Sequence, residues 1–329
     1  MCEIKPVGIV LLNLGGPDAL QAVRPFLYNL FSDRKIIKLG PPFCQKPLAR
    51  FISGLRSGKT EEMYRRIGGK SPIRDISEAQ AGALEKALNT SQVTPRISLS
   101  FKVYVGMRYW HPFIGDTVKR MYEAGIRAVL AVSLYPHYSL ATTGSALGMF
   151  EETISRYQVE SSSVCSWHDH PLYIEALAES IREGMACFDG GGVDVLFSAH
   201  SLPLSIVESG DPYPSQIKGT IDAVVKKIDV RWHLSYQSKS GPVRWLEPST
   251  DDKIRELAKK GVKKLLVVPI SFVSDHIETL YEIDILYKEL AEALGMKLIR
   301  AESLNTTPLF IDTLEDIVIH KVKELGWTG

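Results

Sequence analysis

Cysteine is scarce in this chain, and the few cysteines lie far apart. The 329 residues include only Cys2, Cys44, Cys165 and Cys187. None of them forms a Cys-x-x-Cys pair, so the sequence predicts neither a zinc site nor a disulfide framework. Isolated thiols are typical of a reducing compartment, and we therefore expect a cytoplasmic protein.

Long apolar runs and an excess of one charge are also missing. No apolar stretch approaches the roughly 20 residues that a helix needs to cross a bilayer. The short apolar run near the N-terminus lacks a cleavage motif and is interpreted as a strand. The chain has 39 basic and 38 acidic residues, a formal charge of +1, and no basic arm. This balance gives no field that attracts nucleic acid, so no nucleic-acid partner is expected.

A phosphate-binding loop is absent as well. The segment NLGGPDAL (13–20) follows an apolar run but lacks the G-x-G-x-x-G spacing, and no Walker lysine occurs. The sequence therefore supports neither NAD nor ATP as a cofactor, and a nucleotide-dependent enzyme is disfavoured.

Short β-branched apolar runs alternate with amphipathic segments along the chain. The predicted strands are residues 7–14, 97–107, 127–135, 193–200 and 264–272. Apolar strands separated by helices are typical of parallel sheets covered on both faces. Two intervening segments, 116–125 and 251–261, begin with Asp and end with Gly, which are helix start and stop signals. The predicted fold class is α/β with doubly wound, Rossmann-like sheets.

The chain also contains an internal repeat. The segment that starts at Arg108 matches the segment that starts at Arg244 at a constant offset of 136, with Pro, Asp and Gly in the same places. VGIVLLNLGGP, from Val7, matches VDVLFSAHSLP, from Val193, at an offset of 186. Two matches in the same order predict two similar domains. Because the offsets differ by 50, the first half contains an insertion of about that length.

The repeat sets the predicted domain limits. We assign residues 1–150 and 306–329 to the first α/β domain and residues 151–305 to the second. The insertion, near residues 24–75, belongs to the first domain.

A histidine and several acids follow two of the predicted strands. His200 ends one strand, and Asp275, Glu278 and Glu282 follow another. In an α-helix their spacing of i, i+3 and i+7 places the three carboxylates on one face, beside His276. Ligands of open α/β sheets bind beyond the carboxyl ends of strands, so we expect these groups in a cleft between the domains. An imidazole with one or two carboxylates suits a briefly held divalent metal. A solvated helix face and a structural histidine are the alternatives.

Aromatic side chains recur around the same strand ends. Tyr109, Tyr138, Trp245 and Phe272 are each explained as core residues when taken singly, but together they suggest a flat aromatic ligand. Arg108 has the geometry to bind a ligand carboxylate through two hydrogen bonds, with a helix cap or an internal ion pair as alternatives.

The insertion contains an amphipathic helix. Its apolar residues recur at i, i+3, i+4 and i+7. They are Leu48, Phe51, Ile52 and Leu55. Arg50, Arg56 and Lys59 lie beside them. This stripe either packs on the core of its own domain or forms a lip that contacts a hydrophobic ligand or a membrane surface.

Together, these segments resemble the ferrochelatase family, which inserts ferrous iron into a porphyrin to make haem. The resemblance covers nearly the whole chain. It is carried by LLNLGGP, MYRRIGGKSPI, MRYWHP, TTGSA, LFSAHSLP, SGDPYP, YQSKSGP, VPISFVSDHIETLYEID and RAESLN. It implies the chelatase fold, in which two similar domains with four-stranded parallel sheets enclose the active-site cleft.

The resemblance also implies catalytic roles. His200 and Glu278 match the metal-binding pair, with His200 either a metal ligand or the base for pyrrole protons. Asp275, His276 and Glu282 extend the acidic group.

Further positions match the family's substrate contacts. Arg56, Tyr64 and Ser71 match positions that hold porphyrin propionates, while Trp245 and Phe272 match pocket walls. A second tier, His170 and Asp316, matches a histidine and an aspartate behind the pocket. We add Arg108, Tyr109 and Tyr138 to the expected substrate-binding residues.

Cofactor and partners follow from the same resemblance. Animal members hold a [2Fe–2S] cluster through a cysteine where this chain has Leu140 and through a cysteine-bearing tail, whereas this sequence stops at GWTG. We therefore expect no cluster and no permanently bound cofactor, with ferrous iron as a substrate.

The LYEID segment favours protoporphyrin IX over coproporphyrin as the second substrate. We expect a monomer or homodimer in the cytoplasm with peripheral contact to the inner membrane surface. A cobalt or nickel chelatase of the same fold and a non-catalytic porphyrin or haem carrier are the alternative functions.

Overall fold

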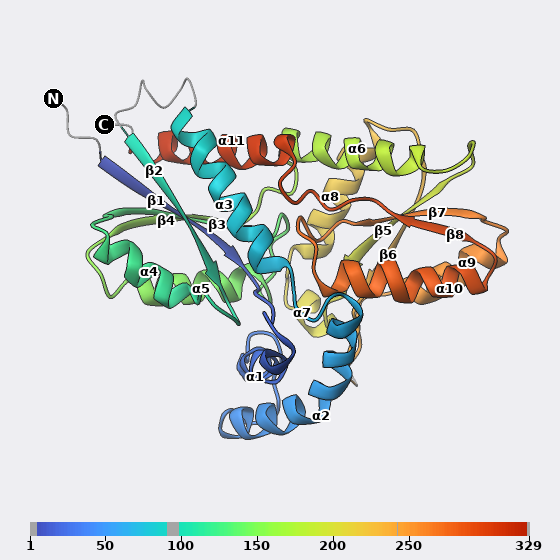
Figure 1. The fold of residues 1–329 in the computed structure, drawn as a ribbon, viewed down its shortest axis with the longest axis horizontal. Coiled ribbons are helices and arrows are strands. Elements are labelled where there is room, and N and C mark those ends of the chain that lie inside the picture. Colours follow the sequence, from blue (N-terminus) through green and yellow to red (C-terminus); the bar gives the residue numbers. More distant parts are fainter. Residues whose placement is uncertain (1–4, 91–98, 242, 328–329) are drawn as a thin grey trace. The chain divides into compact units, whose positions relative to one another are not determined.

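The structure is a computed structural model that describes residues 5–90, 99–241 and 243–327. Cys2 and the first two residues of the predicted strand 97–107 lie outside these ranges. The chain divides into two compact units, Met1–Trp167 with Asn305–Gly329, and His168–Leu304. Each unit contains one four-stranded sheet (Figure 1).

The first unit is built on a sheet with the strand order β2-β1-β3-β4, in which all pairs are parallel. Its strands are β1 (Lys5–Asn13), β2 (Leu99–Met107), β3 (Ala128–Ser133) and β4 (Glu160–Val164). Its longer helices are α1 (Val23–Ser32), α2 (Gln45–Arg66), α3 (Ile73–Thr90), α4 (Ile114–Glu123), α5 (Thr143–Ile154) and α11 (Pro308–Glu324). Two short 3-10 turns are η1 (Leu20–Ala22) and η2 (Pro42–Cys44). Helices α4 and α5 cover one face of the sheet, and α3 and α11 cover the other (Figure 1).

The second unit repeats this plan with the strand order β6-β5-β7-β8, again parallel throughout. Its strands are β5 (Asp194–His200), β6 (Arg231–Gln237), β7 (Lys264–Pro269) and β8 (Lys297–Arg300). Its helices are α6 (Pro171–Ala186), α7 (Leu204–Glu208), α8 (Tyr213–Val225), α9 (Thr250–Lys259), the π-helix η4 (Glu278–Tyr287) and α10 (Lys288–Ala293). Helices α6 and α8 cover one face, and α9 and α10 cover the other (Figure 1).

The shared plan confirms the predicted fold class and the repeat. Strands β3 and β7 begin and end 136 residues apart, as do helices α4 and α9. Gly125 and Gly261 follow these two helices with φ values of +81° and +84°. A side chain at either position would be strained, so glycine ends both helices.

The insertion corresponds to α1 and α2, which separate β1 from α3 in the first unit. In the second unit only the five-residue α7 stands between β5 and α8. The extra residues therefore form a helical pair, and the two helices pack on each other.

The boundary predicted at residue 150 differs from the structure. Strand β4 pairs in parallel with β3 and completes the first sheet, and the first unit extends to Trp167. The sequence ESSSV of β4 has little apolar character because this edge strand is only partly buried, and the apolar pattern therefore did not reveal it.

The apolar stripe on α2 does not pack wholly on the core. Phe51 and Leu55 are 64% and 69% exposed, and Phe43 just before the helix is 81% exposed. Across the described residues, no helix is both long and apolar enough to cross a membrane.

Candidate active site in the second unit

The candidate site lies at the carboxyl ends of β5 and β7, which are neighbours in the second sheet. The chain passes from β5 to β6 on one side of β5, and β7 then pairs with β5 on its other side. The carboxyl ends of β5 and β7 therefore form the topological switch point of the sheet. Doubly wound sheets bind ligands at that point. The fold thus brings the end of β5 and the segment after β7 together, as the sequence predicted.

His200 and Glu278 form the centre of the site. The Nδ1 atom of His200 lies 2.8 Å from Oε2 of Glu278, and the two side chains are 31% and 16% exposed. Ser271 fixes the backbone of His200, because its hydroxyl accepts a hydrogen bond of 2.9 Å from the His200 amide. The Tyr213 hydroxyl donates to the His200 carbonyl at 3.0 Å. The backbone of His200 is therefore anchored through both its amide and its carbonyl, while its imidazole remains partly exposed.

A second carboxylate joins this pair through Ser238. The Ser238 hydroxyl lies 2.7 Å from Oε2 of Glu278 and 2.6 Å from Oε2 of Glu282. Gln237 donates to the Glu278 carbonyl at 3.0 Å and to Glu282 at 3.2 Å. Ser238 has a φ of +67°, an unusual value for a residue with a side chain. This strained backbone directs its hydroxyl between the two acids.

The acid pair titrates unequally. Burial raises the pKa of Glu278, but the charge of His200 and the hydrogen bond to it outweigh burial and hold that pKa well below its usual range. Burial, and then the charge of Glu278, raise the pKa of Glu282 to about 7. Burial lowers the pKa of His200, yet the charge of Glu278 raises it overall. The His200–Glu278 pair therefore shares one proton near neutral pH.

Proton counting supports this assignment. A serine hydroxyl has one proton, so it donates to only one of two acceptors. Both carboxylate oxygens lie within hydrogen-bonding distance of Ser238, so the two acids compete for its one proton. Of the two acids, Glu282 takes up a proton first as pH falls, because its pKa is the raised one.

The histidine next to the acids has a different environment. His276 is 4% exposed, and its Nδ1 atom lies 3.1 Å from the Ser274 carbonyl. Its ring meets the ring of Phe272 edge-on at 4.2 Å, and Phe272 also lies 6.1 Å from the His200 ring. Burial lowers the pKa of His276, so this imidazole is neutral. Phe272 thus connects the two imidazoles.

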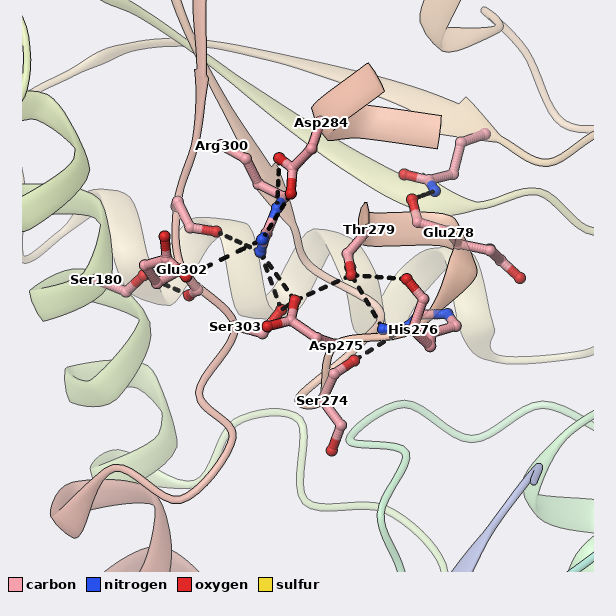
Figure 2. Close-up of polar contacts among 12 residues, drawn as sticks. Ser180, Ser274, Asp275, His276, Glu278, Thr279, Asp284, Arg300, Glu302 and Ser303 are labelled. Carbon is pink, nitrogen blue, oxygen red and sulfur yellow. Dashed lines mark hydrogen bonds and ion pairs between the residues drawn. The ribbon is translucent and has the colours of Figure 1, made fainter. Parts of the chain in front are cut away.

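The predicted placement of Asp275 on one α-helical face with the two glutamates is wrong. The helix begins after Asp275 and is wound as a π-helix, so an α-helical spacing does not apply. The Asp275 carboxylate instead pairs with Arg300 at 3.1 Å and accepts a hydrogen bond from Ser303 at 2.8 Å (Figure 2). Of the three acids, Glu278 contacts His200 and Glu282 is linked to Glu278 through Ser238, whereas the catalytic role of Asp275 stays a prediction.

As it stands, the site is an acid–base cluster. Within the described ranges, no group of three or more His, Cys, Asp or Glu side chains is arranged to hold a metal ion. A cation taken up here would have to replace the hydrogen bond between His200 and Glu278, which suits brief binding.

Arg108 and Tyr109, predicted to bind substrate, form an internal network in the first unit. The Arg108 guanidinium pairs with Asp33 at 2.7 Å and donates to Ser145 at 2.8 Å. The Tyr109 hydroxyl donates to the same Asp33 oxygen at 2.7 Å. The structure therefore realises the internal ion pair that the sequence left as an alternative for Arg108, and the substrate contacts of these two residues stay predictions.

The other predicted contacts are placed as follows. In the first unit, Arg56 is exposed and lies over the Phe31 ring, Tyr64 and Ser71 are 3% and 4% exposed, and Tyr138 is partly buried. In the second unit, Trp245 is partly buried and pairs through its backbone with Pro203. Their roles toward a substrate stay predictions.

The second-tier residues belong to different units. His170 precedes α6, and its carbonyl accepts a hydrogen bond from Ile174. Asp316 lies on α11, with Oδ1 at 3.2 Å from Nδ1 of His320. Their predicted roles are not tested by these contacts.

Sequence reasoning missed Gln237, Ser238 and Arg300 as parts of the site. All three lie in segments that carry the family resemblance, YQSKSGP and RAESLN. Ser238 lies in the YQSKSGP motif, which could have drawn attention to it. Only the fold shows that its hydroxyl contacts Glu278 and Glu282 on η4.

The sequence model of the family described as Ferrochelatase matches residues 6–322. This chain belongs to the ferrochelatase family. The ferrochelatase of Geotalea uraniireducens is 51% identical over 322 residues, covering 96% of this chain and 98% of that protein. The ferrochelatase of Desulfotalea psychrophila is 49% identical over 316 residues, covering 95% and 97%. The chain is therefore an enzyme of the metal chelatase class, as the resemblance implied.

Solved structures support the fold. SirB from Bacillus subtilis with Fe³⁺ has a TM-score of 0.56 at 11% identity, covering 96% of this chain and 95% of that chain. The sirohydrochlorin chelatase SirB in complex with cobalt, from subspecies spizizenii, gives a TM-score of 0.54 at 11% identity, covering 97% and 96%. At such low identity the likeness concerns the fold alone, and it confirms the chelatase fold expected for a ferrochelatase.

One prediction concerns the raised pKa of Glu282. The pKa of this carboxyl group is about 7 in the folded protein and 4.5 in the unfolded chain. Below pH 4.5 the group is protonated in both states and does not change the stability of the protein. As pH rises through about 7 the buried group has to ionise, and the folded protein loses stability. We expect Glu282→Gln to raise the melting temperature by about 2–4 °C at pH values above 7 and not at pH values below 4.5. Thermal unfolding followed by circular dichroism across this range measures the difference.

A carboxylate with the opposite shift serves as the control. Glu256 is held by Lys253 and Lys260, whose hydrogen bonds keep its pKa low, so Glu256→Gln should bring no gain at high pH. An equal gain for Glu282→Gln at both ends of the range would show that Glu282 does not titrate as described.

Proposed function

We propose that this chain inserts ferrous iron into protoporphyrin IX to form protohaem, the last step of haem biosynthesis. The observation that carries the proposal is the contact of 2.8 Å between His200 and Glu278, partly open to solvent at the switch point of the second sheet. Membership of the ferrochelatase family supports the reaction class. The finer choice of porphyrin rests on the LYEID segment (280–284).

The reaction requires two events that these residues can serve. Iron has to exchange bound water for pyrrole nitrogens, and the porphyrin releases two protons as the metal enters. A dication that reaches Glu278 neutralises the carboxylate that keeps His200 protonated, so the imidazole loses its proton more easily. The neutral imidazole is then the base for a pyrrole proton. Iron and proton transfer are thereby coupled through one ion pair.

Glu282 and Ser238 provide the next position for a proton. The Ser238 hydroxyl contacts both acids, so it can accept a proton from one carboxyl group while it gives its own proton to the other. A carboxyl group with a pKa of about 7 both accepts and releases protons near neutral pH. We propose that Glu282 passes protons away from the reacting pair.

Aromatic side chains supply the remaining part of the mechanism. The Phe272 ring lies 6.1 Å from the His200 ring, and Trp245 belongs to the same unit. We propose that they bend the bound macrocycle so that a nitrogen lone pair faces the metal, at a cost of about 1–5 kcal/mol taken from binding energy. Arg56, Tyr64, Ser71 and Tyr138 are the proposed contacts of the porphyrin periphery.

The decisive assay uses purified protein, ferrous iron and a porphyrin without oxygen, followed by the haem spectrum. Protoporphyrin IX should turn over repeatedly and faster than coproporphyrin. A preference for coproporphyrin would indicate a coproporphyrin ferrochelatase, and a preference for cobalt or nickel over iron would indicate a different chelatase. Porphyrin binding without any turnover would indicate a carrier.

We also propose peripheral contact with an anionic membrane through α2. Residues 34–60 contain seven Lys and Arg and no Asp or Glu, although the whole chain has a net charge of only +1. The exposed Phe43, Phe51 and Leu55 lie in the same segment. Basic residues around exposed apolar side chains are typical of helices that lie in a membrane interface.

Vesicle co-sedimentation tests this contact. Phe51→Ser with Leu55→Ser should weaken binding to vesicles of phosphatidylcholine and phosphatidylglycerol by about tenfold or more, because each apolar side chain removed from water contributes about 1.5–3 kcal/mol. Val243→Ser, which changes a 53% exposed apolar residue of the second unit, should bind as the unchanged protein does. Equal binding by all three proteins would refute the contact.

A further inference from the structure

Arg300 is a buried cation with an unusually complete set of partners. It is the last residue of β8, and its side chain is 6% exposed. Its Nε and Nη2 atoms each lie 2.9 Å from an oxygen of Asp284, and Nη1 lies 3.1 Å from Asp275 (Figure 2). Nη1 also approaches the Ser303 hydroxyl at 3.3 Å. The planar guanidinium therefore binds two carboxylates at once, one of them through a bidentate fork.

The two carboxylates are placed on either side of the catalytic acids. Asp275 precedes the π-helix η4, and Asp284 lies within it, so the chain between them contains both Glu278 and Glu282. Asp275 is in turn bonded to the buried hydroxyl of Thr279, the residue next to Glu278, at 3.0 Å. Arg300 thus holds the helix directly at Asp284, and through Asp275 it also holds the start of the helix at Thr279, so the two contacts bracket the acids.

A π-helix needs such support. Its winding is rare and less favourable than that of an α-helix, so contacts with other elements must stabilise it. A shift of the helix by one residue, or a rotation toward α-helical winding, would turn Glu278 away from His200 and Glu282 away from Ser238. A rigid clamp from the neighbouring strand opposes both movements.

We infer that Arg300 is a positioning residue, which fixes the π-helix so that Glu278 and Glu282 face His200 and Ser238. Its partners among the described residues are Asp275, Asp284, Ser303, Ala301 and the exposed Glu302, so it acts through the helix rather than on a substrate. This inference rests on the proposed function for its kinetic consequence, but the placement of the helix can be measured independently.

The test compares Arg300→Met with a variant that breaks another buried ion pair of the same unit. Asp194 is 1% exposed and pairs with Arg231 and His233 at the other end of β5, away from the π-helix. Asp194→Asn therefore controls for lost stability alone. We expect Arg300→Met to lower kcat for iron insertion by about 10²-fold, as expected when catalytic groups are displaced by about 1 Å. The KM for porphyrin should stay within about twofold, because no substrate contact is removed.

Further variants keep the test decisive if Arg300→Met does not fold. Arg300→Lys keeps the charge but loses the fork, and Asp284→Asn removes one arm of the clamp, so both should lower kcat by an intermediate factor. Glu302→Gln, at an 80% exposed carboxylate, should leave kcat unchanged.

Hydrogen exchange gives the readout that does not depend on activity. Amides of Glu278–Tyr287 should exchange faster in Arg300→Met than in Asp194→Asn at equal loss of melting temperature. Unchanged exchange of this segment, or an equal fall of kcat in Asp194→Asn, would overturn the inference. If the unchanged protein inserted no iron, the proposed function would fail, while faster exchange in Arg300→Met would still support the positioning role.

Discussion

Replacing His200 by alanine is expected to lower kcat for iron insertion by about 10³-fold, within the range by which a general base contributes to catalysis. The substitution removes the imidazole that shares a proton with Glu278, and the methyl group of alanine cannot accept a proton. Porphyrin binding should persist, since the aromatic and polar contacts proposed for the macrocycle remain. Steady-state insertion rates and porphyrin fluorescence titration measure the two effects separately.

The second unit offers a matched control for this variant. His233 is also a histidine at 2.8 Å from a carboxylate, that of Asp194, at the opposite end of the sheet. His233→Ala should therefore retain nearly full activity. Turnover near the unchanged level in His200→Ala, or equal losses in both variants, would show that His200 does not have the role proposed.

Replacing Glu278 by glutamine should lower kcat by about 10²–10³-fold. The amide keeps the size of the side chain but removes the charge that raises the pKa of His200, so burial then holds that pKa low. It also removes the carboxylate proposed to receive iron. The KM for ferrous iron should rise, whereas the KM for porphyrin should change little.

Glu256→Gln is the control for a lost carboxylate in the same unit, because Glu256 lies on the outer surface of α9. It should leave both KM values and kcat unchanged. Full activity in Glu278→Gln would contradict the view that a charged carboxylate at this position takes part in the reaction.

The fold could be predicted largely from the sequence because two kinds of signal agree. Apolar runs indicated the strands other than β4, β6 and β8, and the offset of 136 paired β7 and α9 with their counterparts β3 and α4. Strand β4 was missed because an edge strand needs few apolar residues. The insertion was located correctly in sequence, but the exposure of Phe51 and Leu55 depends on packing that a periodic pattern does not record.

The site residues could be predicted only where a reactive side chain lies at the end of a strand or in the segment that follows it. His200 and Glu278 were identified in this way and do meet. Asp275 was wrongly grouped because the prediction assumed α-helical winding, and its true partner, Arg300, comes from another strand. Arg108 similarly found its carboxylate within the unit, in Asp33. In both cases the side chain pairs with a residue of opposite charge that is distant in the sequence. The spacing of residues along the chain does not predict such a partner.

A double-mutant cycle on His200 and Glu278 tests most directly whether they act as one unit. The measured quantity is kcat for iron insertion in the unchanged protein, in His200→Ala, in Glu278→Ala and in the double variant. If the pair shares one function, the double variant should be no slower than the slower single variant, because either substitution alone removes that function. Losses that multiply in the double variant would show that the imidazole and the carboxylate act independently and would contradict the coupling of iron and proton transfer through this pair.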